Sequence, residues 1–453
     1  MIKSRLERLI TYSRGSTGRH VHELRAGQWL DASSSRADQD RRLRALLLHA
    51  ARHVPYYREV LAEAGVCESP GRVLVDRFAQ IPFLDKGTMR TRFGDLNSDD
   101  LSTRTWNYDS TGGSTGEPVR LVHDSDYADW GRALSIVGNC LACRRPDETK
   151  LYLWGSVRDL TGQETLRARL GQWMRNEVWL NSFRMTPDLM HSCVELVNQS
   201  RPDHIIGYVE SIVELARLIE RNGLAVHSPK TVATAAGSLL PHMRELVQGV
   251  FRAEVFDQYG SREVATMATE CDRHEGLHVP SQAVLVEVLR DDGTPAEPGE
   301  TGRIVVTSLV NYAMPLIRYA IGDLGAWAEA PCSCGRVWPL LRSITGRVSD
   351  TFVTADGTLV AGQYFHYVFF LQDWVEKFQV VQESARQIRA RIVRRKDMPD
   401  VGAAEAAGLE EIVHKVHLAM GDDCNVAFEF VNDIAPSASG KYRFTVSKVR
   451  DAP

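Results

Sequence analysis

The chain has 453 residues, a formal net charge of −4 and 25% charged residues. This length exceeds what one hydrophobic core usually supports, so we expect at least two domains. Acidic and basic residues are mixed, which predicts no nucleic-acid partner, and no apolar run reaches the roughly 20 residues that span a bilayer, which predicts no membrane partner. The first eight residues lack the features of a signal peptide, so we expect a cytoplasmic protein whose cysteines are thiols or metal ligands.

Alternating patterns along the first three quarters of the chain predict an α/β fold. Apolar spacing predicts helices over residues 39–65, interrupted at Pro55. After them come short apolar strands and amphipathic helices in turn: strands at 121–122, 150–155, 204–208, 231–236 and 254–257, and helices at 128–141, 213–221 and 243–251. This alternation is typical of doubly wound sheets.

A change of pattern near residue 281 predicts a β-rich subdomain. Residues 281–308 alternate apolar and polar side chains around an Asp291-Asp292-Gly293 turn, as hairpins do. Short strands and one polar helix near residues 403–418 follow the last boundary. We therefore expect a large N-terminal domain, residues 1–349, of doubly wound sheets plus this subdomain, and a small mobile α+β C-terminal domain, residues 350–453.

A run of small hydroxyl residues and glycines predicts a phosphate-binding loop. It consists of Ser110, Thr111, Gly112, Gly113, Ser114, Thr115 and Gly116. Glycine backbones can turn several N–H groups toward one anion, and the hydroxyl groups supply further donors. The run is not the GxxxxGK[ST] loop of common NTPases, because Glu117 follows its last glycine. Taken alone, such a run is equally typical of a plain hairpin or linker.

Four more segments match, in order and spacing, the motifs of another family. They are Asp257-Gln258-Tyr259-Gly260-Ser261-Arg262-Glu263, the segment from Asn311 to Asp323, Gly346-Arg347-Val348-Ser349-Asp350, and Pro436-Ser437-Ala438-Ser439-Gly440-Lys441. With these the chain resembles the adenylate-forming superfamily of acyl- and aryl-CoA ligases over nearly its whole length. Segments 53–58 and 81–86 make it most similar to the phenylacetate–CoA ligase and capsular-polysaccharide-type (CapK-like) group.

The resemblance implies a role for each of these motifs in binding ATP. The ring of Tyr259 lies against adenine, with Gly260 and Ser261 beside the nucleotide, and Glu263 holds Mg²⁺, a hard cation that prefers carboxylate oxygens. Asp323 accepts hydrogen bonds from both ribose hydroxyls. Arg347 reaches ribose or phosphate at the hinge between the domains.

Two further implied roles concern catalysis and the nucleotide pocket. Lys441 is the lysine that enters the site during adenylation and stabilises charge between the substrate carboxylate and the α-phosphate. Gly237 and Ser238 line the nucleotide pocket, although relatives usually have Gly-Glu at this point. Glu117 likewise replaces a common lysine. An aromatic acid is favoured by the resemblance alone, with Trp154, Phe183 and Tyr208 as candidate pocket walls or ordinary core residues.

Cysteine and histidine residues on both sides of the ribose motif predict a structural zinc site. Cys271, Cys332 and Cys334 with one histidine would supply four ligands of the kind Zn²⁺ prefers. The resemblance favours His278, in a Gly-Leu-His context, and His274 is the alternative ligand. Free thiols and surface histidines are the other interpretation. The remaining thiols, Cys67, Cys140, Cys143, Cys193 and Cys424, are expected in the core.

The predicted activity is therefore ATP-dependent activation of a carboxylic acid to an acyl-adenylate, followed by transfer to coenzyme A. One alternative keeps adenylation but passes the acyl group to an amine, a carrier-protein thiol or another nucleophile. Another is a non-catalytic nucleotide-binding homologue whose motifs have eroded, as Glu117 and Ser349 would suggest. The resemblance also makes a homodimer plausible.

Overall fold

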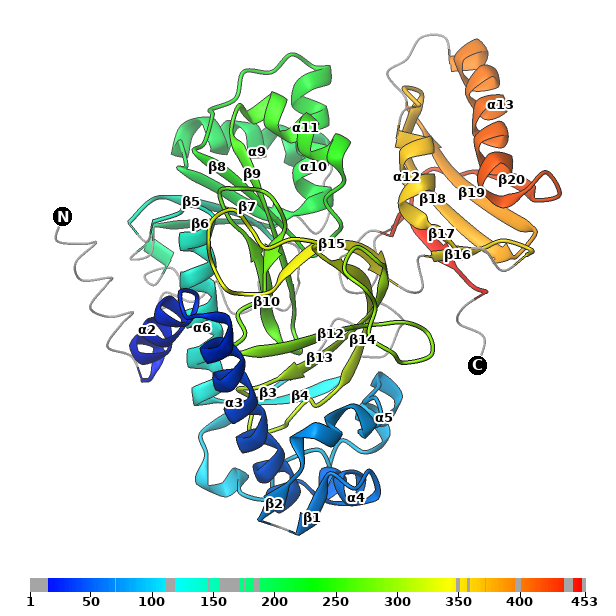
Figure 1. Cartoon of the computed structure of the whole chain (residues 1–453). Coiled ribbons are helices and arrows are strands. Elements are labelled where there is room, and N and C mark those ends of the chain that lie inside the picture. The colour runs from blue at the N-terminus through cyan, green and yellow to red at the C-terminus, as the bar shows by residue number, and fades with distance from the viewer. Residues whose placement is uncertain are drawn as a thin grey trace. The chain divides into compact units, whose positions relative to one another are not determined.

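The computed structural model (Figure 1) describes residues 15–69, 71–110, 119–145, 147–154, 172–173, 176–181, 187–347, 351–356, 359–370, 372–395, 401–435 and 443–449. The chain divides into two compact units. The boundary lies between Ile344 and Thr345, and only short segments belong to the unit on the other side of it. The predicted limits of the domains, 1–349 and 350–453, stay a prediction, because residues 348–350 lie outside the described ranges. In those ranges no helix is long and apolar enough to cross a membrane.

Three helices begin the described chain: α2 (Thr17–Gly27), α3 (Ala32–His53) and α4 (Pro55–Glu63). The helix predicted from residue 39 begins earlier, because the Asp31 side chain accepts a hydrogen bond from the Ser34 backbone N–H and so caps α3. Pro55 ends α3 and starts α4. The strands β1 (Cys67–Ser69) and β2 (Arg72–Val73), the 3₁₀ turn Val75–Gln80 and α5 (Lys86–Thr91) follow.

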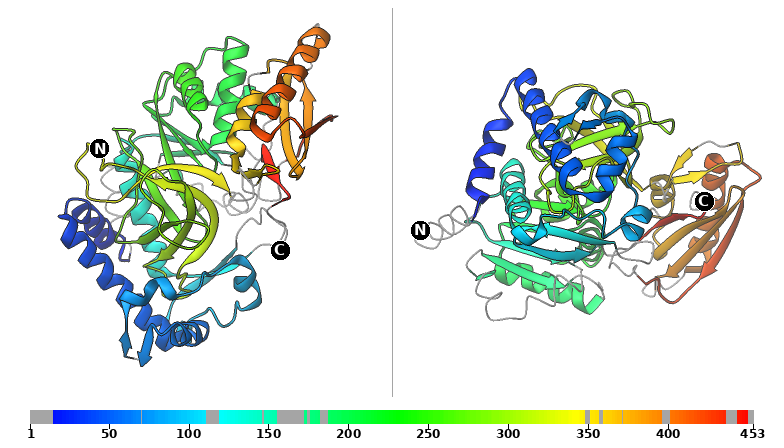
Figure 2. Two further views of the ribbon diagram at one scale, coloured as in Figure 1. Left: turned by 45° about the vertical axis from the view of Figure 1, so that its right-hand side comes forward. Right: turned by 90° about the horizontal axis from the view of Figure 1, so that it is seen from below.

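A two-stranded ribbon carries the glycine-rich run in its connection. Its strands are β3 (Trp106–Ser110) and β4 (Arg120–Asp124), which pair antiparallel from Trp106 opposite Asp124 to Ser110 opposite Arg120. Helix α6 (Ser125–Leu141) begins directly after β4, capped by the Asp124 side chain. Helix α2 runs beside α6 (Figure 2), where Thr17 donates a hydrogen bond to Asp129.

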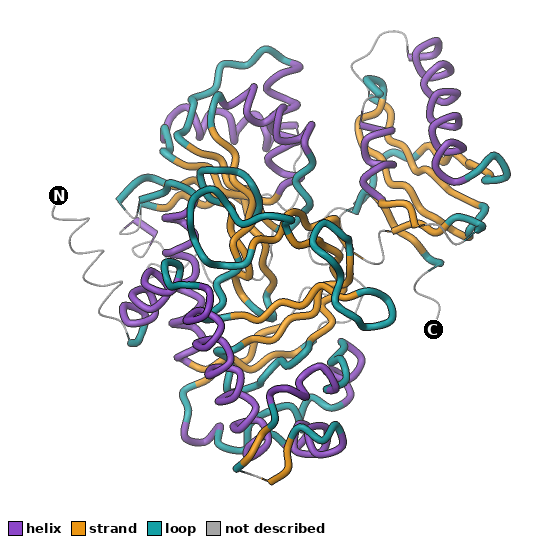
Figure 3. Tube along the Cα trace, in the orientation of Figure 1, coloured by secondary structure: helices purple, strands orange, loops and turns teal. Residues whose placement is uncertain are grey.

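The central element is an 11-stranded sheet with a parallel and an antiparallel part. The parallel part has the order β9-β8-β7-β5-β6, and its strands are β5 (Lys150–Trp154), β6 (Glu177–Asn181), β7 (His204–Tyr208), β8 (Thr231–Ala235) and β9 (Glu254–Ser261). Helices α9 (Pro187–Ser200), α10 (Val209–Arg221) and α11 (Pro241–Phe251) pack beside it (Figures 1 and 3). The predicted α/β class is confirmed. The order reverses between β5 and β7, and such a switch point leaves a crevice at the carboxyl ends of the strands.

The antiparallel part continues the same sheet beyond β9. Its strands are β10 (Ala265–Glu270), β11 (Leu277–His278), β12 (Val284–Leu289), β13 (Gly302–Ser308), β14 (Tyr319–Trp327) and β15 (Leu340–Arg347). The predicted hairpin is the β12–β13 pair, in which Val284 lies opposite Ser308. The burial of β12 alternates over its first five residues, whereas β13 is buried at almost every position, so both of its faces are covered. A continuous core of the described N-terminal residues connects the sheet to α2, α3, α4 and α6.

The second unit is a four-stranded sheet with the order β20-β19-β18-β21. Its strands are β18 (Val375–Ser384), β19 (Gln387–Arg394), β20 (Asn425–Phe430) and β21 (Thr445–Ser447), with a small ribbon of β16 (Thr351–Val353) and β17 (Leu359–Ala361). Helices α12 (Gly362–Phe370) and α13 (Val401–Met420) complete it. Aromatic and aliphatic side chains, among them Phe365, Trp374 and Ile412, form a core of its own.

Candidate active site and metal centre

Glu263 is buried at the end of β9 and two tyrosines hold it there. Only 6% of the residue is exposed. The Tyr319 hydroxyl donates a hydrogen bond to Oε1 of the carboxylate at 3.0 Å, and the Tyr127 hydroxyl donates to the Glu263 backbone carbonyl at 3.1 Å. Burial raises the pKa of Tyr127, so this donor keeps its proton. The carboxylate therefore has a fixed orientation in the turn between β9 and β10.

The turn from β9 to β10 explains the spacing of the motif around Glu263. Gly260 lies so close to β10 that a Cβ atom there would approach the Ala265 carbonyl oxygen to 2.7 Å. The Ser261 hydroxyl accepts a hydrogen bond from the Val264 backbone N–H. Tyr259 is buried in β9, with 9% of its surface exposed. Gly260 and Ser261 thus allow the tight turn that places Glu263 directly after the strand that bears Tyr259.

Three more polar side chains meet at the base of the glycine-rich run, and the sequence analysis gave none of them a role. Nη1 of Arg262 lies 3.3 Å from Oδ1 of Asp109, which also accepts a hydrogen bond from the Ser110 backbone N–H at 2.7 Å. Nδ1 of His123 lies 3.9 Å from Oδ2 of Asp109. Burial lowers the pKa of His123, although Asp109 opposes that shift. Only spatial contact relates these residues, since Asp109 and Arg262 are 153 positions apart.

The predicted ribose ligand, Asp323, lies half-buried in β14. Gly322 before it has a φ of +89° with no atom near the position of a Cβ. Such a backbone suits glycine and turns the following residue. Gly237 and Ser238 are half-buried and follow β8 after one residue, Ala236, which has a φ of +63°.

Several predicted site residues cannot be placed. Thr111, Gly112, Gly113, Ser114, Thr115, Gly116 and Lys441 lie outside the described residues, and so does Phe183. Ser110 is the last residue of β3. Arg347 ends β15, but its side chain is not described. Among the predicted site residues that are described, the structure brings Glu263 and its motif close to Ser110 at the end of β3.

Two aromatic residues lie where the parallel sheet reverses its order. Trp154 is the last residue of β5 and Tyr208 the last of β7. Their ring centroids are 4.7 Å apart. Tyr152 and Trp179 form a second pair, stacked at 4.2 Å, two positions earlier on β5. The first pair therefore lies at the carboxyl edge, where open α/β sheets bind ligands.

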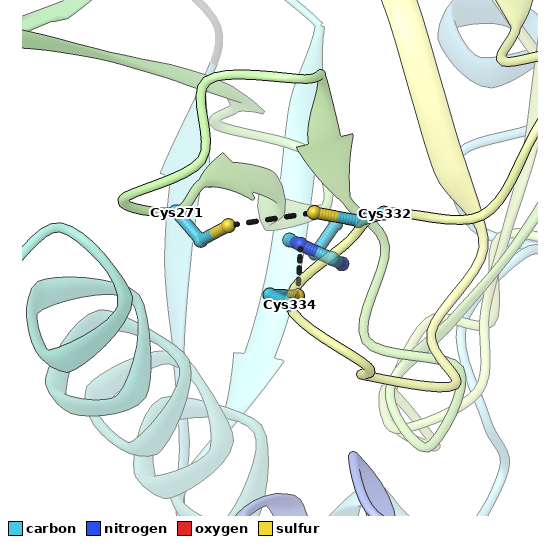
Figure 4. A group of neighbouring side chains, drawn as sticks. Cys271, Cys332 and Cys334 are labelled. Atoms are coloured by element: carbon cyan, nitrogen blue, oxygen red, sulfur yellow. Dashed lines mark hydrogen bonds between the residues drawn. The ribbon is translucent and has the colours of Figure 1, made fainter.

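The four residues predicted to bind zinc converge in the structure (Figure 4). Cys271 follows β10, His278 ends β11, and Cys332 and Cys334 lie between β14 and β15. Their donor atoms all lie within 4.8 Å of one another. The Cys271 and Cys332 sulfur atoms are 3.7 Å apart, and Nε2 of His278 lies 3.4 Å from the Cys334 sulfur. Cys271, His278 and Cys332 are buried.

This geometry fits a tetrahedral ion. Zn–S bonds of about 2.3 Å place two sulfur ligands roughly 3.8 Å apart, and Zn–N bonds of about 2.0 Å bring nitrogen slightly closer to sulfur. His274 is not part of the cluster: its Nδ1 lies 3.4 Å from Oε1 of Glu270.

Hydrogen bonds outside the cluster hold the Cys332–Cys334 loop. The Glu275 carboxylate accepts two hydrogen bonds from Ser333, each of 2.7 Å. Nε of Arg336 donates to the Gln28 side chain at 2.7 Å. The loop is therefore fixed to the β10–β11 connection on one side and to the end of α2 on the other.

The prediction that the remaining five cysteines lie in the core is wrong for Cys140 and Cys143, whereas Cys67 is partly buried and packs against the core. Cys193 and Cys424 are buried, but Cys140 and Cys143 are exposed and Cys67 is partly exposed. Cys140 lies in the last turn of α6, and Cys143 follows the helix, which ends at Leu141. Their small apolar side chains were not sufficient to indicate burial.

Comparison with known proteins finds relatives of this chain. Residues 352–448 match the family model described as the CapK C-terminal domain. The chain is 25% identical over 356 residues to the phenylacetate-coenzyme A ligase of Thermus thermophilus, covering 76% of this chain and 78% of the relative. It is 22% identical over 425 residues to Protein CapK of Staphylococcus aureus, covering 91% and 89%.

A solved structure supports the fold. The chain superimposes on 2-hydroxyisobutyryl-CoA ligase, in complex with an acyl-adenylate, with a TM-score of 0.73 and 21% identity, covering 94% of this chain and 92% of that one. The resemblance inferred from the motifs is thus confirmed: the chain is a relative of the phenylacetate–CoA ligases and CapK and has the fold of adenylate-forming CoA ligases.

Proposed function

We propose that the protein is an ATP-dependent, adenylate-forming CoA ligase. A carboxylate oxygen of the acid attacks the α-phosphorus of ATP, the bond from that phosphorus to pyrophosphate breaks, and an acyl-adenylate forms. The CoA thiol then loses its proton to solvent, its sulfur attacks the acyl carbon, and the bond to AMP breaks. The observation that carries the proposal is the orientation of the buried Glu263 carboxylate by Tyr319, the first residue of the strand that bears Asp323.

The described residues suit the charge of ATP. Glu263 offers a hard oxygen ligand of the kind that Mg²⁺ binds, and Mg²⁺ would neutralise phosphate charge before the acid attacks. Asp323 would accept the ribose hydroxyls, and Tyr259 would lie against adenine. Ser110 and the run up to Gly116 would surround the phosphates, beside Gly237 and Ser238. Lys441 and Arg347 keep the roles that the resemblance implies.

Acid-dependent exchange of pyrophosphate into ATP tests the adenylation step. A panel of aryl, aliphatic and amino acids is supplied with ATP and Mg²⁺, and CoA is added to each acid that supports exchange. Exchange followed by a thioester and AMP is the expected result. Exchange without thioester formation would indicate that the acyl group passes to an amine or a carrier-protein thiol in place of CoA. The absence of exchange over a broad panel would contradict the proposal in favour of a non-catalytic nucleotide-binding homologue.

We also propose that Cys271, His278, Cys332 and Cys334 bind a structural Zn²⁺. Four protein ligands complete a tetrahedral shell, so such a site has no open position for chemistry. It would join the β10–β11 connection to the β14–β15 connection, which are 61 residues apart between Cys271 and Cys332. Its contribution would be to the stability of the N-terminal unit.

Elemental analysis of protein purified without chelator tests this site. About one equivalent of zinc per chain is expected, and its removal or the substitution Cys334→Ser should lower the melting temperature. Cys143→Ser and His274→Ala are matched controls, because one changes an exposed thiol and the other the histidine outside the cluster. Protein without zinc, or equal zinc loss from His274→Ala and His278→Ala, would contradict the assignment. The cytoplasmic location and the homodimer stay predictions.

A further inference from the structure

The β3–β4 ribbon presents aromatic and cationic side chains to solvent on one of its two faces. We propose that this face binds the adenosine 3′-phosphate end of coenzyme A, with Tyr108 stacking on the adenine ring and Arg120 pairing with the 3′-phosphate. The inference rests on the proposed ligase activity and adds to it the site that holds the nucleotide of the thiol substrate.

The register of the ribbon gives its two faces different surroundings. Successive side chains of a strand point to opposite faces. Oδ1 of Asp109 lies 3.3 Å from Nη1 of Arg262 in the β9–β10 turn, so the Asp109 face meets the active-site motif. Tyr108 belongs to the other face. Arg120 shares that face, because Tyr108 pairs with Val122 and Arg120 lies two positions before Val122.

The ring of Tyr108 is held in place and yet exposed. Trp106 meets it edge-on with the ring centroids 4.9 Å apart, and Phe93 lies 6.2 Å away in a tilted plane. Phe93 is buried in the core of the N-terminal unit and anchors the group there. Nevertheless 64% of Tyr108 is exposed. An exposed ring whose orientation is already restricted offers a stacking surface for a planar base.

Arg120 supplies positive charge beside this ring. Its Cζ lies 4.3 Å from the centroid of Phe93, which is a cation–π contact. The residue is exposed, and no carboxylate in the described parts of the chain pairs with it. A guanidinium has a planar fork of donors that matches phosphate oxygens in a bidentate contact. The face therefore combines a stacking ring with a cation that suits phosphate.

This combination matches the nucleotide end of CoA. One ribose joins its adenine to its 3′-phosphate, and Tyr108 and Arg120 lie on either side of the single Phe93 ring, so both groups can be bound at once. The thiol of CoA ends a long flexible arm, so its nucleotide can bind away from the reacting carbon. Because the opposite face of the same thin ribbon contacts the active-site motif, a nucleotide on this face keeps the arm beside that motif.

Steady-state thioester formation with CoA and with dephospho-CoA, which lacks the 3′-phosphate, tests the inference on the full chain. Tyr108→Ala should raise the KM for both thiols by roughly 5- to 50-fold, as expected for the loss of base stacking. Arg120→Gln should raise the KM for CoA by about 3- to 10-fold and leave the KM for dephospho-CoA within about 2-fold. Tyr108→Phe, which keeps the ring, should behave like the wild-type protein.

Trp29→Ala is the matched control, because Trp29 is also an exposed aromatic residue beside an arginine: Cζ of Arg336 lies 5.0 Å from its ring. This variant should keep both KM values. Unchanged KM values in Tyr108→Ala, or equal losses for the two thiols in Arg120→Gln, would overturn the inference. So would a fall in pyrophosphate exchange without CoA as large as the fall in thioester formation, since the substitutions would then act on adenylation.

The wild-type protein separates failure of this inference from failure of the proposed function. Pyrophosphate exchange without thioester formation would overturn the inference, because CoA would not be the acceptor. The absence of exchange with every acid would instead refute the proposed function.

Discussion

Tyr319 is the residue on which the orientation of Glu263 most depends. Its hydroxyl donates to Oε1 of the carboxylate, and the residue is fully buried. Tyr319→Phe keeps the ring but removes this donor, which costs about 1.5–3 kcal/mol for a hydrogen bond to a charged group. We expect pyrophosphate exchange to need several-fold more Mg²⁺ for half its maximal rate, with the rate at saturating Mg²⁺ largely restored.

A second buried tyrosine provides the control for this prediction. The Tyr57 hydroxyl accepts a hydrogen bond from the Ile317 backbone N–H at 3.0 Å, two residues before Tyr319. Tyr57→Phe should therefore lower the melting temperature without changing the Mg²⁺ dependence. If both variants changed only the melting temperature, Tyr319 would have no part in positioning Glu263.

Asp257, two residues before Tyr259, should make the stability depend on pH. Burial and the nearby Glu270 carboxylate raise its pKa to about 7. Between an unfolded value near 3.8 and about 7 the folded chain keeps a proton that the unfolded chain has lost, so the free energy of unfolding falls as the pH rises. Asp257→Asn should thus stabilise the protein by about 1–2 kcal/mol at pH 8.5 and by almost nothing at pH 4.

Asp203 offers a control of opposite sign. Although burial opposes the shift, hydrogen bonds from Thr149 and Lys230 lower the pKa of Asp203 to about 2. Its contribution to stability is present above the unfolded value and is lost as the pH falls toward 2, so Asp203→Asn should destabilise the protein at pH 8.5. Thermal unfolding at both pH values measures the two effects. If Asp257→Asn and Asp203→Asn changed the stability at pH 8.5 in the same direction and by the same amount, these pKa shifts would be contradicted.

At the scale of elements, the reversal of strand order between β5 and β7 predicts where the acid binds. Trp154 and Tyr208 end these strands with their rings 4.7 Å apart. If they form a wall of the acid pocket, Trp154→Leu and Tyr208→Leu should raise the KM for the preferred acid by about 10-fold, through lost aromatic contact, and leave the KM for ATP unchanged. Steady-state exchange kinetics measure both constants.

The neighbouring aromatic pair tests whether this effect is specific to the strand ends. Tyr152 lies two positions earlier on β5 and stacks on Trp179 at 4.2 Å. Tyr152→Leu should reduce stability but leave acid selectivity unchanged. The same loss for the acid in all three variants would mean that the substitutions disturb the sheet as a whole.

Much of this element order could be predicted from the sequence, because local apolar periodicity is strong in it. Strands such as His204–Tyr208 lie within one residue of their predicted limits. The tyrosines that hold Glu263 could not be predicted in the same way. Tyr127 and Tyr319 are 136 and 56 positions away from Glu263, and only the folded sheet brings them to it. The cysteine cluster could be predicted from the sequence, because few residue types bind a metal ion and this limits the residues that can belong to such a cluster.

At the scale of the whole molecule, the described residues form two units, each with its own core, and the proposed reaction has two half-reactions. The contacts that hold Glu263 lie within the N-terminal unit, whereas Lys441 comes from the C-terminal part of the sequence. A cation that stabilises the adenylation transition state is not needed when a thiol attacks the finished adenylate. The two half-reactions should therefore depend on Lys441 to very different degrees.

Lys441→Ala tests this difference directly. Formation of the acyl-adenylate, measured by pyrophosphate exchange, should fall by roughly 100- to 1,000-fold, because a charge at the reacting phosphorus is lost. Thioester formation from synthetic acyl-adenylate and CoA should stay within about 3-fold of the wild-type rate. Lys448→Ala is the control, since Lys448 is a nearby lysine paired with Glu383. Unchanged rates in both half-reactions would show that Lys441 is not the adenylation lysine, and equal losses in both would place it in binding rather than in one chemical step.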